Sequence, residues 1–375
     1  PTLRSKTMTI LMRPSLRDTT HHCNNAHAGL LLTRGLTEWQ TGEKTLKAAL
    51  IDKVASVQSN TLYKKAFERW LDTTSKPEQF GAVTASVTGR LMMGLSTGGA
   101  IETGMCTHHT YGMPMIAGSS VKGAVRSYAD SIGLAKEYQS VLFGADEDLA
   151  KAANTVEGAG YLVWHDAWWI PEGNSKPFVG EVVTVHHQDY YGGRGEATDF
   201  DSPVPNQQLA VQGSFYFVVE GDIRWVALAI RLLRDTLQQQ GIGAKRAAGY
   251  GFMTENSELK TKLATSQKAA QEQAQAVKDE VKEIEEDKKR TPAQRKINEI
   301  LKQNQKGAKH PPELALLQKL EAGICQDCQE KREIAEHIKQ LMQVNKTWKE
   351  KSGKADPSKD KDYQRTLKVV KFLTE

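Results

Sequence analysis

The distribution of glycine divides this chain more sharply than any other sequence feature. Of its 30 glycines, only Gly307, Gly323 and Gly353 lie beyond Asn256. The sequence beyond Asn256 is rich in Ala, Gln, Lys and Glu, which favour helix, whereas glycine destabilises helix interiors. We therefore expect a helical C-terminal region after an N-terminal region that mixes helices and strands.

Length and composition are those of an ordinary globular protein. The 375 residues suffice for one large or two modest domains, with 39% hydrophobic and 25% charged side chains. No run of about 18 apolar residues would cross a membrane, and the first residues lack the apolar core of a signal peptide. Four cysteines in a chain of this length do not form a disulfide framework. These features predict a cytoplasmic protein without a membrane partner.

The net charge of +5 is unevenly distributed along the chain. Residues 257–375 contain 26 Lys and Arg against 20 Asp and Glu, a balance of +6. The rest of the chain contains 24 basic and 25 acidic side chains, a balance of −1. Nucleic-acid binding by the first 256 residues would therefore depend on where the basic residues lie and not on total charge.

Hydrophobic periodicity in the first 256 residues alternates between that of helices and that of strands. Strands are expected at residues 82–93, 161–164, 181–185, 215–219 and 250–253. Helices are expected at residues 43–72, from about 120 onward, and at 223–240. From residue 82 onward the order is strand, helix, strands, helix, strand, which is the ferredoxin-like βαββαβ pattern with insertions. We predict an α+β fold, with a mainly helical segment at 1–80 packed on a ferredoxin-like domain at 81–256.

Residues 257–375 are expected to form a charged, all-helical region. One long, solvated helix with a thin apolar stripe is predicted over 258–289. Thr291 followed by Pro292 is typical of an N-cap and first helical residue, and Pro311-Pro312 begins another helix. Hydrophobic spacing predicts two more helices nearer the C-terminus. The region is expected to be a small bundle or a partly extended set of helices.

A glycine-rich basic loop, residues 111–126, leads directly into a predicted helix. Gly118 and Ser119 precede this helix, and Ser119 is expected to be its N-cap. Lys122 lies in the first turn, and Arg126 lies one turn later on the same side. Free N–H groups, the helix dipole and both cations would stabilise an anion bound there. We interpret this loop as a phosphate site; the alternative is an ordinary capped helix with solvated basic side chains.

A second glycine-rich basic loop, residues 241–251, follows the last helix predicted in the first 256 residues. Gly243 and Gly249 flank Lys245 and Arg246, and glycine lets backbone N–H groups approach a ligand closely. The loop lacks the Gly-Lys-Ser/Thr ending of a P-loop and follows a helix, whereas a dinucleotide-binding loop follows a strand. The two loops together predict RNA binding; the alternative for the second is a flexible connection.

Several stretches of the sequence resemble the RAMP superfamily of CRISPR proteins. They are residues 98–126, 183–191 and 199–205, together with 28–32 and 63–70. As a set they are similar to the type III-B (Cmr) subunit that caps the 3′ end of the guide RNA. Ala117 stands where the family usually has proline, and Arg246 where threonine is common. The resemblance spans about residues 25–255, so the role of 257–375 stays open.

The resemblance implies an RRM-type ferredoxin-like fold that holds the backbone of the guide RNA. Its implied partners are the guide RNA, the target RNA paired with it, the backbone RAMP subunit, a second end subunit and a small subunit. Target cleavage in such complexes is assigned to the backbone subunit, so this chain is expected to be non-catalytic, without cofactor or metal. The residues expected to contact RNA are Gly118, Ser119, Ser120, Lys122, Arg126, Gly243, Lys245, Arg246, Gly249, His109 and His187.

Two histidine pairs, His108-His109 and His186-His187, keep an enzymatic alternative open. Metal-independent RNA cleavage needs a base for the 2′-hydroxyl and an acid for the leaving oxygen. His109, His187 and Lys122 could supply these groups, and some RAMP relatives are such nucleases. Adjacent histidines on a strand point to opposite faces, so neither pair readily chelates one ion. A pure protein scaffold is the third hypothesis.

Other chemistry-bearing residues have plainer interpretations. Cys325 and Cys328 form a single CxxC, and zinc would need two further ligands, so unreactive thiols are expected. Asp189, Asp199 and Asp201 are expected to shape loops. The lysines between residues 351 and 361 are expected to belong to a disordered linker with at most a weak attraction for phosphate.

Aromatic residues gather near the predicted strands. They are Trp164, Trp168, Trp169, Tyr190 and Tyr191. Aromatic side chains on a sheet face can stack on bases, but they serve equally often as core or subunit contacts. Residues 190–195 are predicted to project from the fold, where they could reach a neighbouring subunit or the guide–target duplex.

Overall fold

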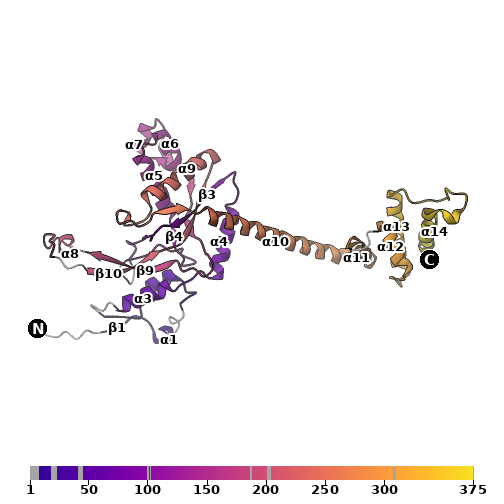
Figure 1. Cartoon of the computed structure of the whole chain (residues 1–375), viewed down its shortest axis with the longest axis horizontal. Helices are drawn as coiled ribbons and strands as arrows, with labels where there is room; N and C mark the ends of the chain where they lie inside the picture. Colours follow the sequence, from indigo (N-terminus) through magenta and orange to yellow (C-terminus); the bar gives the residue numbers. More distant parts are fainter. Residues whose placement is uncertain are drawn as a thin grey trace. The chain divides into compact units, whose positions relative to one another are not determined.

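The computed structural model describes residues 8–17, 23–40, 45–98, 101, 103–185, 188–200, 204–306 and 310–374 (Figure 1). The chain divides into two compact units, residues 1–268 and 269–375. Among the described residues, no helix combines the length and apolar character needed to cross a membrane.

The first unit is built on an antiparallel sheet. Its strands lie in the order β12 (Met253–Glu255), β3 (Phe80–Val87), β11 (Ser214–Glu220), β8 (Ala167–Trp169) and β4 (Met115–Ile116), and β7 (Val163–Trp164) also pairs with β11. The longest pairing, between β3 and β11, runs from Phe80 opposite Glu220 to Ser86 opposite Ser214. If β3, β8, β11 and β12 are numbered in chain order, they lie in the order 4-1-3-2 and every neighbouring pair is antiparallel.

Two helices, α5 (Gly118–Ser131) and α9 (Ile223–Asp235), pack on one face of this sheet. Both are amphipathic, because their apolar residues recur at helical spacing. Their buried side chains join those of the sheet in the largest core cluster, which includes Val121, Val125, Val226, Ile230, Phe217 and Val219. The approach is close at Gly81 of β3, where an added Cβ would lie 2.5 Å from Val226 Cγ1.

The opposite face of the sheet is also covered. Because side chains alternate along a strand, Tyr216 and Val218 of β11 point away from the face that holds Phe217. They pack with α4 (Thr61–Thr73) and with the first turns of α10 (Ser257–Lys289) in a second cluster that contains Phe67, Leu71, Ile170 and Leu259. The buried Tyr216 hydroxyl lies 3.0 Å from the Thr74 hydroxyl. Neither face of β11 is therefore free to bind a ligand.

A β-hairpin forms a separate sheet in the first unit. Strands β9 (Phe178–Val185) and β10 (Val204–Val211) pair antiparallel, from Phe178 opposite Val211 to Val185 opposite Val204. Helix α3 (Thr45–Ala55) packs on the hairpin, and α8 (Gln188–Tyr191) lies at its far end in Figure 1. The exposed fractions of Tyr190, Tyr191 and Phe200 are 55%, 75% and 97%. The described part of the hairpin end therefore presents aromatic side chains to solvent.

Smaller elements complete the first unit. They are β1 (Thr9–Ile10), α1 (Pro14–Arg17), α2 (Ala28–Arg34) and β2 (Glu38–Trp39), then α6 (Lys136–Phe143), β5 (Gly144–Ala145), α7 (Glu147–Ala152) and β6 (Gly158–Ala159). Strand β1 pairs with β2, and β5 pairs with β6. The elements from α6 to β6 form an insertion between α5 and β7.

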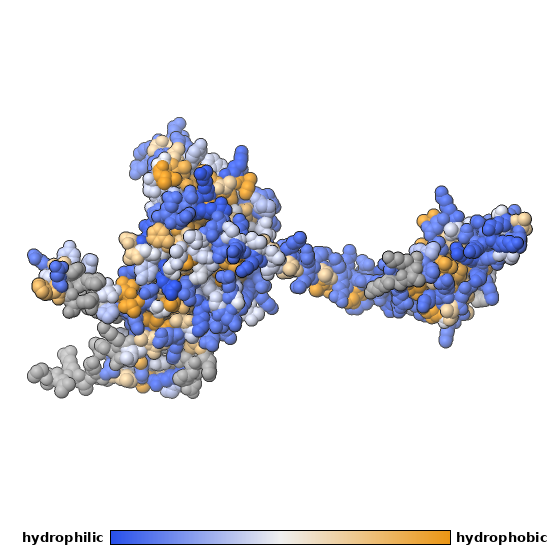
Figure 2. Space-filling view, viewed as in Figure 1, coloured by the Kyte–Doolittle hydropathy of each residue, from blue (hydrophilic) through white to orange (hydrophobic). Residues whose placement is uncertain are grey.

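Every regular element among the described residues of the second unit is a helix. The unit contains the rest of α10, then α11 (Pro292–Lys306), α12 (Pro312–Glu321), α13 (Cys328–Val344) and α14 (Lys361–Thr374). The last four helices share a core that includes Ile297, Leu316, Leu320, Ile334, Ile338 and Val369. In contrast, α10 is mostly hydrophilic beyond Leu263, apart from a thin stripe formed by Val277, Val281 and Ile284, each at least half exposed (Figure 2).

The basic segment before α14 is a folded loop, so the prediction of a disordered linker is wrong. It contains a 3₁₀ turn, Pro357–Lys359. The next residue, Asp360, is buried and accepts hydrogen bonds from Lys349 Nζ at 2.9 Å and from the Gly353 N–H at 3.0 Å. These bonds lower the pKa of Asp360 to about 2, the Lys349 bond contributing most. A charge-assisted cluster thus holds the loop against α14.

The mixed α and β character and the long helix after Asn256 are confirmed. The prediction of one helix over 43–72 is wrong, because α3 ends at Ala55 and a new N-cap follows, where Asn60 Oδ1 accepts the Tyr63 N–H at 2.9 Å. The strand predicted at 82–93 ends at Val87, and residues 91 and 92 make only single bridges. The division into 1–80, 81–256 and 257–375 stays a prediction.

Candidate nucleic-acid interface

The second glycine-rich loop, residues 241–251, is attached to the segment that follows β3. The Ala244 N–H donates to the Met92 carbonyl at 2.7 Å. Gly243 has a φ of +92°, and a Cβ at this position would lie 2.4 Å from the Met92 carbonyl oxygen. Gly249 also has a positive φ, +89°, but a Cβ there would meet nothing within 4 Å. Gly243 is therefore required for packing of the loop, whereas Gly249 faces open space.

The N-terminus of α5 is already occupied by a carboxylate of the protein. The helix begins at Gly118 with Ala117 as N-cap, so the prediction of Ser119 as N-cap is wrong. The Gly118 N–H donates to Asp166 Oδ1 at 2.7 Å, and the Ser120 N–H donates to the Ala117 carbonyl at 2.8 Å. Neither N–H is a free donor for RNA, contrary to expectation. The exposed Asp166 also places a negative charge where a phosphate was predicted.

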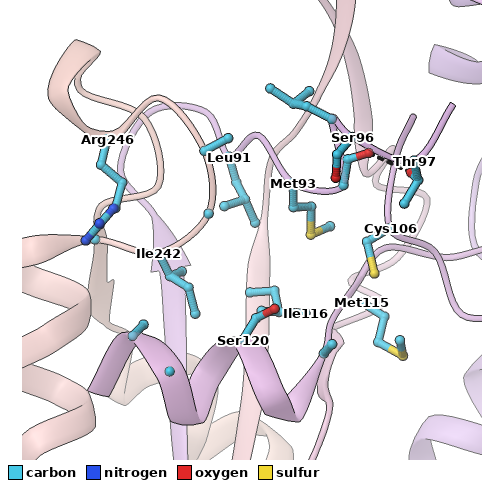
Figure 3. A pocket seen from close by; sticks show the side chains of 18 of the residues that line it. Leu91, Met93, Ser96, Thr97, Cys106, Met115, Ile116, Ser120, Ile242 and Arg246 are labelled. Carbon is cyan, nitrogen blue, oxygen red and sulfur yellow. Dashed lines mark hydrogen bonds between the residues drawn. The ribbon is translucent and has the colours of Figure 1, made fainter. Parts of the chain in front are cut away.

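A cavity of about 670 Å³, here named the loop groove, lies between α5 and the second loop (Figure 3). Its floor is formed by the buried side chains Leu91, Met93, Ile116 and Ile242. Its walls include Ser96, Thr97, Ser120, Gly123, Ser127, Gly243 and Arg246. Parts of both glycine-rich loops, far apart in the sequence, therefore line one cavity.

A second cavity of about 680 Å³, here named the histidine cavity, adjoins the loop groove. Its lining includes His27 and His109, together with threonine and glycine residues from the stretch before β4. Thr97 and Cys106 line both cavities. The two cavities are therefore neighbours, and of the two only the loop groove is lined by described residues of α5.

Positive charge in the loop groove comes from the second loop. Among the described residues that line it, Arg246 alone carries a formal charge. Lys245 is exposed beside it and has a left-handed backbone with φ of 58°. Neither side chain forms an ion pair with any residue that the structure describes. Both cations are therefore available to an external anion.

Backbone donors are also present in the second loop. No hydrogen bond within the described part of the chain involves the N–H groups of Lys245, Arg246 or Ala247. The left-handed Lys245 followed by a 3₁₀ turn, Arg246–Ala248, places these three N–H groups in succession. Successive N–H groups in such a turn bind anions. The Gly249 N–H is not available, because it donates to the Arg246 carbonyl at 2.9 Å.

The first loop contributes less charge than expected. Lys122 is half-buried and does not line the loop groove. Arg126 pairs with Asp146 at 3.3 Å on the surface. The Leu149 N–H and then the Arg126 guanidinium lower the pKa of Asp146. An RNA phosphate would have to compete with this carboxylate for Arg126.

The histidines have partners in the protein. His27 Nδ1 accepts the Leu30 N–H at 3.1 Å, so Nε2 carries the proton and donates to the His109 carbonyl at 2.8 Å. The exposed His109 side chain lines the histidine cavity. Burial lowers the pKa of His108, whose ring packs 4.8 Å from that of Trp168. His186, His187 and Asp201 lie outside the described residues, so the pairing of His109 with His187 stays a hypothesis.

The aromatic residues near the strands are mostly structural. Trp164 and Trp169 are buried in the core. Trp168 stacks with Tyr63 and Trp70 at centroid distances of 5.9 and 6.1 Å. The core alternative therefore holds for these tryptophans. Of the five aromatic residues predicted near the strands, Tyr190 and Tyr191, on α8, are exposed as a base-stacking role would require.

No group of three or more His, Cys, Asp or Glu side chains in the described part of the chain is arranged to hold a metal ion. Cys325 is buried and Cys328 is exposed. Burial is also the main cause that raises the pKa of Cys325 and of Cys106, the thiol that lines both cavities.

Sequence reasoning missed two parts of this interface. One is segment 91–97, which supplies floor and wall to the loop groove, and of which only residues 91–93 were assigned, to the end of a strand. The other is Asp166, which caps α5 from a position 48 residues later in the chain. No local sequence signal marks either, because both act through tertiary contacts.

Comparisons with known proteins find similarity to one family. A model of the RAMP superfamily matches residues 84–254, the stretch that contains both loops and strands β4 to β11. The CRISPR system Cmr subunit Cmr6 of Pyrococcus furiosus is 24% identical, over 60% of this chain and 83% of that protein.

Two solved structures are also similar. A type III-B Cmr-beta complex bound to cognate target RNA, solved by cryo-electron microscopy, contains a chain that is 18% identical with a TM-score of 0.44, over 57% of this chain and 72% of its own. The crystal structure of Cmr6 from Pyrococcus furiosus is 21% identical with a TM-score of 0.31, over 47% of this chain and 98% of its own. From the family model and the curated relative, we conclude that residues 84–254 match the RAMP superfamily, in a chain that resembles the Cmr6 subunit of a CRISPR system.

Proposed function

We propose that this chain is an RNA-binding subunit of a type III-B Cmr effector complex, which holds the guide RNA near its 3′ end without cleaving it. The main support is the meeting of both glycine-rich loops at one cavity inside the RAMP domain. Its partners would be the guide RNA, the target RNA paired with it, the backbone RAMP subunit, the second end subunit and the small subunit. Such a complex would act in the cytoplasm.

The strand order 4-1-3-2 supports a ferredoxin-like, RRM-type fold for the domain. An RRM stacks bases on the open face of its sheet. In this chain that face is covered by α4 and α10, and Tyr216 of β11 is buried there. RNA would therefore bind at the loop groove, beyond the end of β3, and not across the sheet.

The second loop would supply the main phosphate contacts. Lys245 and Arg246 offer unpaired cations, and the N–H groups of residues 245–247 offer backbone donors. Ser119, Lys122 and Arg126 would contribute secondary contacts from α5, weakened by the carboxylates of Asp146 and Asp166. Contacts of this kind recognise the RNA backbone and tolerate any guide sequence.

The non-catalytic role is supported by the chemistry of the groove walls. Among the described residues of the loop groove, two side chains have a titratable proton, Arg246 and Cys106. Burial raises the pKa of Cys106. In the histidine cavity, both ring nitrogens of His27 are engaged by the protein. An acid and base pair for RNA cleavage would thus need His109 and a group from elsewhere.

The salt dependence of RNA affinity tests the binding role, with Lys245→Ala and Arg246→Ala combined in the full chain.

Cleavage is tested by incubating the full chain with repeat-containing RNA in EDTA. We expect intact RNA, and cleavage that disappears in His109→Ala would contradict the proposal.

The position of this chain near the 3′ end of the guide is tested by cross-linking in the assembled complex. Guides with a photoreactive nucleotide near the 3′ end should label this chain, and guides modified near the 5′ end should not.

A further inference from the structure

We infer that the loop groove binds a nucleobase of the RNA and that the phosphates on either side of this base lie at its rim. The inference rests on the proposed function, because it states how the same groove receives the strand. It follows from a contrast within the groove: the charge lies at one edge, in Arg246, and the interior is apolar.

The floor of the groove suits a base and excludes a phosphate. Leu91, Met93, Ile116 and Ile242 have exposed fractions of 0%, 6%, 3% and 2%, and their side chains face the cavity (Figure 3). A phosphate on this surface would lose its hydration without gaining a partner. The faces of a nucleobase are apolar and gain from leaving water. The cavity volume of about 670 Å³ is within the range of small-molecule sites.

The polar groups around this floor suit the edge of a base. Ser96 and Ser120 are exposed at the wall, and hydroxyl groups donate or accept as the partner requires. The Thr97 hydroxyl is not available as a donor, because it donates to the Gly94 carbonyl at 2.6 Å. Adaptable hydroxyls above an apolar floor accept purines and pyrimidines alike. The groove should therefore bind a strand with bases more tightly than a strand without them. It should show little preference among the four bases.

One wall of the groove is helix α5, and it leaves room for a planar ring. Gly123 and Ala124 face the cavity, and a Cβ added at Gly123 would meet nothing within 4 Å. Ser127, one turn later, is held by Gln240 Nε2 at 3.0 Å. The wall is thus fixed at one end and open at Gly123. A larger side chain at Gly123 would fill the groove and leave the protein core unchanged.

The test compares two ligands on the full chain, a single-stranded RNA of about nine nucleotides and a sugar–phosphate strand of equal length without bases. Gly123→Leu fills the groove, and Ser131→Leu adds the same side chain to an exposed position of α5 outside it. For the wild type, the ratio of the two affinities measures what the bases contribute. We expect this ratio to fall about tenfold in Gly123→Leu, the effect of roughly 60 Å² of apolar surface returned to water. Ser131→Leu should keep the wild-type ratio.

Each result separates the inference from the proposed function. An unchanged ratio in Gly123→Leu overturns the base site, while the salt dependence of Lys245→Ala with Arg246→Ala still decides whether phosphates are bound. If Gly123→Leu blocks assembly with partner subunits but keeps the ratio, the groove belongs to a protein contact and the inference is wrong. Failure of the wild type to bind either strand overturns both. Leucine stabilises an exposed helix position relative to glycine, so the variant should fold, and its melting temperature verifies this.

Discussion

Removal of the two cations of the second loop is the sharpest perturbation of the proposed interface. Lys245 and Arg246 are exposed, and neither pairs with any residue that the structure describes. Their replacement by alanine therefore breaks no internal ion pair. Lys245 has a φ of 58°, and its Cβ already carries the cost of this left-handed backbone. Alanine has the same Cβ, so the replacement should change stability little, and the melting temperature verifies this.

The magnitude follows from counterion release. Each phosphate contact with a single strand contributes a slope of about −0.7 to the plot of log affinity against log salt. Loss of both contacts should reduce the slope by about 1.4 in magnitude. If the variant and the wild type bind equally well at 1 M salt, the variant should bind about 25-fold more weakly than the wild type at 0.1 M and about threefold more weakly at 0.5 M. The variant should thus approach wild-type affinity as the salt concentration rises.

The assay is the affinity of the full chain for single-stranded RNA at several salt concentrations. A matched control is Lys260→Ala with Lys262→Ala, which removes the same charge from exposed positions of α10 in the same compact unit. We expect this control to keep the wild-type slope. Equal slopes for the wild type, the loop variant and the control would refute the assignment of Lys245 and Arg246 as phosphate contacts.

Three further predictions concern residues that hold the loop groove and the loop before α14 in place. Asp166→Asn keeps an acceptor for the Gly118 N–H but removes a negative charge beside the groove. RNA should then bind about twofold more tightly, as a titration measures, while the helix loses about 0.5 kcal/mol of stability, as thermal unfolding measures. Gly243→Ala should destabilise the chain by about 2–3 kcal/mol, because a Cβ meets the Met92 carbonyl, and Gly249→Ala by only about 1 kcal/mol; similar melting temperatures would contradict this. The pKa of Asp360 is lowered in the folded state to about 2, so its stabilisation is complete above the unfolded value of about 3.9 and is lost as the pH falls toward 2. Unfolding of the full chain between pH 5 and pH 2, wild type against Asp360→Asn, should show a smaller acid dependence in the variant.

The sequence predicted elements best where local signals were strong. The helix at Ser257–Lys289 and the Thr291 N-cap, whose hydroxyl accepts the Gln294 N–H at 3.2 Å, follow from composition and capping rules. The break between α3 and α4 was missed, because apolar residues keep helical spacing on both sides of it. The N-cap of α5 was misplaced because its capping carboxylate, Asp166, comes from a distant strand connection.

The site was predicted in its parts but not in its assembly. Glycine spacing and the adjacent cations identified the second loop, and Arg246 does line the cavity. The expected donors Gly118, Ser120 and Gly249 are engaged within the protein, and Arg126 has a carboxylate partner. Competition between internal and external partners depends on distances that a sequence does not contain.

By itself the sequence determined the mixed and helical regions, the two basic loops and the resemblance to RAMP proteins. These features rest on local composition and spacing, which act over a few residues. Only the tertiary structure decided that both loops line one groove, that α4 and α10 close the sheet face, and that a carboxylate occupies the start of α5. The physical reason is that burial and pairing are set by groups brought together across the fold, so the same lysine or N–H is free or engaged according to its neighbours in space.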